Sequence, residues 1–121
     1  MLTRTRRLVG VAAAVIALAG AAPAHAATLS VAPCRAQSAS TGSETAILLH
    51  GHYADTADIA FDVVLTCHIV QGGRIIASST DLMGGPVAAL ASDERIPPGA
   101  FTVCYEVETK HFWGTNFHSN C

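Results

Sequence analysis

The sequence lacks the motifs that mark the common classes of catalytic site. It contains no G-x-S-x-G turn for a serine nucleophile, no H-E-x-x-H pair for a zinc protease, and no paired-carboxylate motif in a recognisable setting. The acidic pairs Asp93-Glu94 and Glu106/Glu108 are typical of a solvated strand face. All of the cysteines suit disulfide bridges better than nucleophilic roles. We therefore expect that the protein is not an enzyme and carries no cofactor.

Close cysteine pairs and a surplus of basic residues are missing as well. The four cysteines are separated by gaps of 33, 37 and 17 residues, whereas structural zinc sites use close pairs such as C-x-x-C. Without the three arginines at the N-terminus, four Lys and Arg stand against nine Asp and Glu, a formal charge of −5. Nucleic acids and anionic membranes both attract clustered basic residues. The charge balance therefore argues against either as a partner of the mature chain.

The N-terminus has the three regions of a secretory signal peptide. Its arginines precede an uncharged apolar stretch, residues 8–22, which is followed by the small residues Ala24 and Ala26. A membrane-spanning helix needs ~20 apolar residues, and this stretch is shorter. We expect a cleaved signal peptide over residues 1–26, with cleavage after Ala24 as the near alternative, and a single secreted, extracellular domain over residues 27–121. Four cysteines in a short exported chain predict two disulfides.

Period-two alternation of apolar residues is the main structural signal in the mature chain. It is clearest over residues 59–70 and 101–108, and it recurs over 45–53. The inward faces that it predicts are Ile47, Leu49 and Tyr53; Ile59, Phe61, Val63, Leu65, Cys67 and Ile69; and Phe101, Val103, Tyr105 and Val107. Such alternation indicates half-buried strands.

Turn signals divide the rest of the chain. The glycine pair in residues 71–74 predicts a hairpin, with a returning strand to Ser78. A short first strand is expected over residues 29–34 and a Ser/Thr/Gly-rich loop over 36–43. Residues 83–95 remain ambiguous between strand and helical turn, and no long segment has the 3.6-residue helical period. The pattern predicts an all-β fold: an antiparallel, immunoglobulin-like sandwich of about seven strands, with a small closed β-barrel as the alternative.

The overall layout adds one resemblance. A signal peptide, an alanine-rich composition and a short mature domain with four cysteines follow one another along the chain. In this layout it resembles the small, alanine-rich secreted proteins common in actinobacteria, many of them uncharacterised. The resemblance implies an extracellular location rather than an activity.

Two histidines separated by one glycine form the first candidate site. On a strand, His50 and His52 would share a face, and together they could supply two ligands to Cu(II) or Zn(II). His68, Asp55 or Asp58 could complete the site. The alternative is a pair of solvated surface histidines near the end of a strand.

Aromatic residues near the C-terminus form the second candidate site. Phe112 and Trp113 lie in a predicted turn over residues 111–114, with Phe117 behind them, before a last strand over residues 115–121. Exposed aromatic rings at a hairpin tip are typical of binding to a protein or to a carbohydrate. The alternative is that Trp113 folds back and caps the core. We place the binding site at Phe112 and Trp113, with Tyr53 and the histidine pair as secondary candidates, on a monomeric protein.

A third candidate is the segment over residues 93–98. Its Ile96-Pro97-Pro98 core resembles the reactive loop of Bowman–Birk protease inhibitors. This resemblance implies an inhibitor of secreted hydrolases. The segment departs from that family because no cysteine flanks it closely enough to close the loop.

The pairing of the four cysteines can be predicted from the last hairpin. If its turn centres on residues 112 and 113, Cys104 and Cys121 lie directly opposite each other on adjacent antiparallel strands, within reach of a bridge. Cys34 then pairs with Cys67 by elimination. Four cysteines allow three pairings, and a Cys34–Cys121 bridge would instead clamp the two ends of the domain together.

Overall fold

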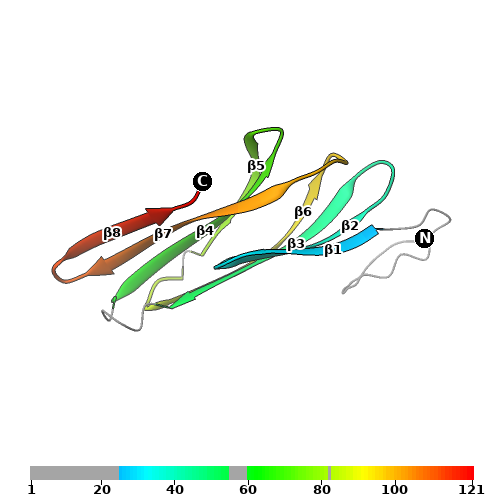
Figure 1. The fold of residues 1–121 in the computed structure, drawn as a ribbon. Helices are drawn as coiled ribbons and strands as arrows, with labels where there is room; N and C mark the ends of the chain where they lie inside the picture. The colour runs from blue at the N-terminus through cyan, green and yellow to red at the C-terminus, as the bar shows by residue number, and fades with distance from the viewer. Residues whose placement is uncertain (1–24, 55–59, 82) are drawn as a thin grey trace.

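The computed structural model describes residues 25–54, 60–81 and 83–121, and these residues form two antiparallel sheets that face each other (Figure 1). One sheet has the strand order β1-β2-β3-β6 and the other β5-β4-β7-β8. The sheets share no strand, so the fold is an open two-layer arrangement rather than the closed barrel considered above. The strands are β1 (His25–Val31), β2 (Cys34–Ser40), β3 (Thr45–Ala54), β4 (Asp62–Gln71), β5 (Arg74–Thr80), β6 (Val87–Ile96), β7 (Thr102–His111) and β8 (Gly114–Ser119). The described residues include no helix capable of spanning a membrane.

The core lies between the sheets and follows the predicted alternation. On β4, the four inward side chains have no exposed surface; β3 faces them from the other sheet with buried aliphatic residues, and β7 adds more beside them in the same sheet. These inward residues are Val63, Leu65, Cys67 and Ile69 on β4, Ile47 and Leu49 on β3, and Val103 and Val107 on β7. The apolar face of each strand therefore determines which side of its sheet faces the partner sheet.

The burial predicted from the alternation is wrong at the start of the segment over residues 59–70. Phe61 was expected to face inward, but it is 60% exposed, and its neighbour Ala60 is buried instead. The ladder of β4 begins only at Asp62, and the period of two applies only where the chain is held in a pleated strand. Ile59, the other expected inward residue, lies outside the described residues.

The N-terminal part of the domain differs from the prediction. Residues 36–43 were expected to form a loop and 29–34 a strand. Instead β1 ends at Val31, the chain reverses at Ala32-Pro33, and β2 occupies Cys34–Ser40 between β1 and β3. The small side chains of β2 gave little hydrophobic signal, yet they pack well in an interior strand. His25 and Ala26 form the first two positions of β1, and the rest of the predicted signal peptide lies outside the described residues.

The ambiguous stretch before Pro97 is a long strand. β6 pairs with β3 over ten residues, from Val87 opposite Ala54 to Ile96 opposite Thr45. Residues 93–96 therefore belong to the edge strand of a sheet rather than to an extended loop. The loop predicted over residues 93–98 is a strand as far as Ile96, because the ladder with β3 extends across these residues.

Both disulfides form with the predicted pairing. Cys34–Cys67 joins β2 to β4 and so connects the two sheets, and both cysteines are almost fully buried. Cys104–Cys121 joins β7 to the residues that follow β8. The register of this hairpin pairs Glu106 with Ser119, so the two cysteines lie opposite each other if that register continues.

Candidate functional site

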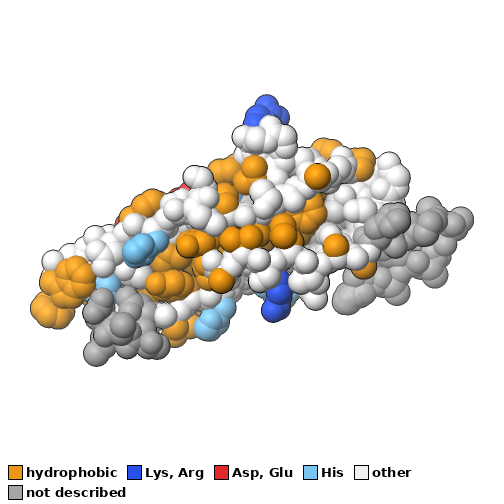
Figure 2. All heavy atoms as spheres, in the orientation of Figure 1, with side chains coloured by type: hydrophobic (Ala, Val, Ile, Leu, Met, Phe, Trp, Pro, Cys, Tyr) orange, Lys and Arg blue, Asp and Glu red, His pale blue; other side chains and the backbone are white. Residues whose placement is uncertain are grey.

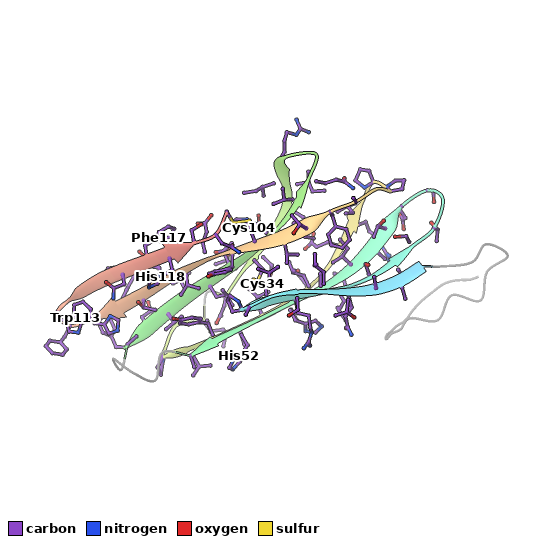
Figure 3. All side chains as sticks on the ribbon, in the orientation of Figure 1. Cys34, His52, Cys104, Trp113, Phe117 and His118 are labelled. Atoms are coloured by element: carbon purple, nitrogen blue, oxygen red, sulfur yellow. A yellow bond between two sulfur atoms is a disulfide. The ribbon has the colours of Figure 1, made fainter. Side chains whose placement is uncertain are left out.

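One end of the sandwich carries most of the large apolar side chains that face solvent. Phe112 and Trp113 form the two-residue turn between β7 and β8, and they are 96% and 54% exposed. Phe61 reaches the same end, because its backbone N–H donates a hydrogen bond to the carbonyl of Lys110 on β7 (2.9 Å). Phe117, further along β8 and opposite Glu108, is also exposed (Figure 3). We call Phe61, Phe112, Trp113 and Phe117 the aromatic end.

The connection before β6 extends the aromatic end. Met83 is almost fully exposed, and the carbonyl of Gly85 accepts a hydrogen bond from the N–H of Val63 near the start of β4 (2.8 Å). Asp81 holds this connection in place by accepting hydrogen bonds from the N–H groups of Met83 and Ala89. In the space-filling view, apolar side chains cover the hairpin tip at one extremity of the molecule (Figure 2). The apolar surface therefore comes from three separate connections.

Trp113 does not cap the core. Its ring stacks on His111, with the ring centroids 4.5 Å apart and the planes 13° from parallel. His111 is itself buried, so it supports the indole from the protein side. The stacking fixes the direction of the indole while about half of the residue stays open to solvent. Of the two alternatives set out above, the structure shows the exposed tip.

His68, the predicted partner of the histidine pair that lies within the described residues, does not join it. His50 and His52 lie on the outer face of β3, where His50 is half-buried and His52 exposed. His68 lies on β4, in the other sheet. In Figure 3 the label of His52 shows the position of the first sheet, and the label of Cys104, on β7, shows that of the second. The suggestion of His68 as a third ligand was wrong, because the alternation alone could not tell which sheet each strand would join. Asp55 and Asp58 lie outside the described residues.

Tyr53 lines a cavity between the sheets. The cavity has a volume of about 320 Å³ and is open to solvent on one side. It is lined by Ala32, Pro33, Tyr53, Tyr105, Val107 and His118. The predicted hairpin register could have revealed part of this group, since it places His118 opposite Val107.

A polar cluster on the outer face of the second sheet was missed entirely. His68 is mostly buried there, with its Nδ1 2.5 Å from Ser78 Oγ and its Nε2 2.9 Å from Glu106 Oε2. The Sγ of Cys121 lies within 4.8 Å of the ligand atoms of His68 and Glu106. His68, Ser78 and Glu106 are far apart in the sequence, and the pairing of β5, β4 and β7 brings them together. Cys121 joins them through its disulfide to Cys104 on β7.

In comparisons with known proteins, no family model, no curated protein and no solved structure matches this chain. The geometry of the described residues therefore carries the functional argument. It offers an aromatic end exposed to solvent, an open cavity at Tyr53, and a polar cluster at His68.

Proposed function

We propose that the protein is a secreted, non-enzymatic binding module that engages a protein partner through the aromatic end. The observation that carries this proposal is the exposure of Phe61, Phe112 and Trp113 on neighbouring connections. Clusters of large apolar side chains on the surface of a soluble domain are characteristic of interaction sites. Aromatic anchors also dominate the energetics of protein interfaces.

The strand order supports placing the binding site at this end. We propose an immunoglobulin-like sandwich in which β3, β4, β7 and β8 take the places of strands B, C, F and G. The chain passes between the sheets from β3 to β4, from β5 to β6 and from β6 to β7. In immunoglobulin variable domains, the B–C and F–G connections lie at one end and form part of the antigen-binding surface. Here the corresponding connections carry Phe61, Phe112 and Trp113.

A carbohydrate partner is the second candidate, because of the stacking of Trp113. The ring held flat against His111 leaves indole surface open to solvent, and aromatic faces of this kind dock on sugar rings. A protein partner fits the aromatic end better, since this end presents several exposed apolar side chains in addition to that indole.

Replacing the two tip aromatics should abolish binding without unfolding the domain. We expect Phe112→Ser/Trp113→Ser to lower the free energy of unfolding by only about 1–2 kcal/mol, because the variant loses the buried half of the indole and its stacking on His111 but no core residue. Binding should weaken by about thirtyfold or more, because an interface hot spot contributes about 2 kcal/mol or more. The measurement compares pull-downs of protein and polysaccharide from culture supernatant and cell-wall material, together with urea unfolding.

Ile75→Ser is the matched control for this experiment. Ile75 is 50% exposed and lies beside the β4–β5 hairpin, at the opposite end of β4 from Asp62. We expect this variant to retain the same partner as the wild type. Equal capture by the tip variant would contradict the proposal, and so would a loss of several kcal/mol of stability, which would assign Trp113 to the core. A partner that survives protease digestion of the wall fraction would identify a carbohydrate.

The mass of the exported protein tests the proposed processing. We expect protein recovered from culture medium to have the mass of residues 27–121 less four hydrogens, because two disulfides each remove two. Cleavage after Ala26 would shorten β1 by its first two residues and leave Ala27–Val31 paired with β2. Reduction should add the four hydrogens back. A mass that retains residues 1–26 would contradict export by this signal.

A further inference from the structure

The cluster around His68 has the donor atoms of a metal site, but its cysteine, Cys121, is held in a disulfide. It offers an imidazole nitrogen, a carboxylate oxygen and the Cys121 sulfur within 4.8 Å of one another. Cys104, bonded to Cys121, places a second sulfur directly beside that of Cys121. Nitrogen, oxygen and thiolate sulfur are the donors that zinc prefers. Sulfur in a disulfide is a poor ligand, however, because the thiolate is the metal-binding form of cysteine.

The two disulfides differ in access to a reductant. Cys34 and Cys67 are 1% and 0% exposed and lie in the core between the sheets. Cys121, in contrast, is exposed, and only its partner Cys104 is buried. Thiol–disulfide exchange requires direct attack on a sulfur atom, so access controls which bridge reacts first. A reductant can therefore open Cys104–Cys121 while Cys34–Cys67 still holds the sheets together.

We propose that reduction of Cys104–Cys121 by a dithiol converts this cluster into a zinc-binding site. One thiolate of the dithiol attacks Cys121 Sγ and releases the Cys104 thiolate, and its second thiol then displaces Cys121. Two electrons pass from the dithiol, which leaves as a cyclic disulfide, and two protein thiols remain. Zn²⁺ then binds both sulfurs as thiolates, together with His68 Nε2 and Glu106 Oε2, and the two thiol protons pass to solvent.

The distances within the cluster fit this change. Ligand atoms on tetrahedral zinc lie roughly 3.3–3.8 Å apart, given metal–ligand bonds of about 2.0–2.3 Å. His68 Nε2 and Glu106 Oε2, now 2.9 Å apart, would separate by only a few tenths of an ångström to admit the ion. Two sulfurs joined covalently are about 2.05 Å apart, so they cannot both bind the same zinc until the bridge opens. The bridge thus acts as a gate on metal binding.

Ser78 orients the imidazole for this role. In the disulfide-bonded form Nε2 donates to Glu106 Oε2. In the zinc-bound form neutral His68 carries its proton on Nδ1 instead, so that Nδ1 donates to Ser78 Oγ and the Nε2 lone pair binds the metal. Second ring nitrogens of zinc-bound histidines are held by hydrogen bonds in this way in most known sites. Ser78 is therefore a positioning residue, and Glu106 a ligand.

Cobalt binding tests the proposal directly. The disulfide-bonded protein is treated with a limited amount of dithiothreitol, desalted under nitrogen and titrated with Co²⁺, which takes zinc's tetrahedral geometry and reports on its ligands by absorption. We expect thiol labelling to find two free cysteines, Cys104 and Cys121. One Co²⁺ per chain should bind, with sulfur-to-cobalt charge transfer in the near ultraviolet, and Zn²⁺ should displace it. The untreated protein should show no such absorption.

Variants separate this site from adventitious binding. Glu106→Gln and Cys121→Ser each remove a ligand and should weaken Co²⁺ binding by more than about tenfold, and Ser78→Ala by about tenfold or more. His52→Ala, an exposed histidine on the other sheet, should bind like the wild type. Cobalt uptake without charge transfer, equal uptake by the untreated protein, wild-type affinity in Glu106→Gln, or the appearance of four free thiols would each overturn the proposal.

Discussion

Loss of the buried bridge, in Cys34→Ala/Cys67→Ala, is expected to lower the free energy of unfolding by about 4–5 kcal/mol. The bridge closes a loop with a sequence separation of 33, and the chain-entropy model assigns about 3.7 kcal/mol to a loop of that length. The two sulfurs also pack in the core between β2 and β4, so their removal loses buried contacts in addition. Such a loss is a large share of the stability of a domain of this size.

The second bridge supplies the control for this measurement. Cys104→Ala/Cys121→Ala opens a loop with a sequence separation of 17, for which the same model gives about 3.1 kcal/mol. Cys121 is exposed, so little packing is lost in addition, and we expect a decrease of about 3 kcal/mol. Urea unfolding of both variants and the wild type resolves the difference. An equal or larger decrease for the exposed bridge would contradict the expectation that Cys34–Cys67 contributes more to stability than Cys104–Cys121.

The sequence predicted the strands whose apolar residues alternate without interruption. β4 and β7 form the centre of the second sheet, and each is buried on one face by the partner sheet. That arrangement imposes period-two alternation on the sequence, so both strands could be predicted from it. The hairpin of β4 and β5 could be predicted for a different reason. Gly72 and Gly73 both have positive φ, 62° and 75°, and such turns favour glycine.

The strands that escaped prediction have weaker patterns for physical reasons. β2 buries mainly alanine and exposes Arg35 and Gln37, and it lies between two strands where small buried residues suffice. β6 alternates in burial, but its outward residues include Asp93 and Arg95, which read as a polar loop. Strand assignment here depends on the partner β3, which no local window of sequence contains.

The candidate sites show the same limit. The tip of the last hairpin was predictable because both of its residues are local to one turn, and Phe112 and Trp113 are exposed as expected. The association of Phe61 with that tip depends on a hydrogen bond to Lys110 across the sheet. The cluster of His68, Ser78 and Glu106 depends on the register of three strands. Chemistry assembled by sheet pairing is therefore not visible from sequence spacing alone.

Gly51, between the two histidines of the pair, is required by the packing of the core. It lies on the inward face of β3, between the outward His50 and His52. A Cβ at this position would lie 2.8 Å from Cys67 Sγ, 2.8 Å from Leu65 Cδ2 and 3.0 Å from Leu90 Cγ. Contacts this short do not occur in folded proteins, so the core must shift to admit even a methyl group. The absence of a side chain at position 51 is thus a requirement of packing against the buried disulfide.

Gly51→Ala should therefore lower the free energy of unfolding by about 2–3 kcal/mol, since overpacking of a tight core has effects of this size. Gly42→Ala is the matched control, because a Cβ there meets nothing within 4 Å, and its effect should stay below about 0.5 kcal/mol. In the Cys34→Ala/Cys67→Ala background the nearest sulfur is gone, so the decrease caused by Gly51→Ala should become smaller. Such non-additivity is expected of residues in direct contact. An undiminished decrease in that background would show that the disulfide is not what excludes a side chain at position 51.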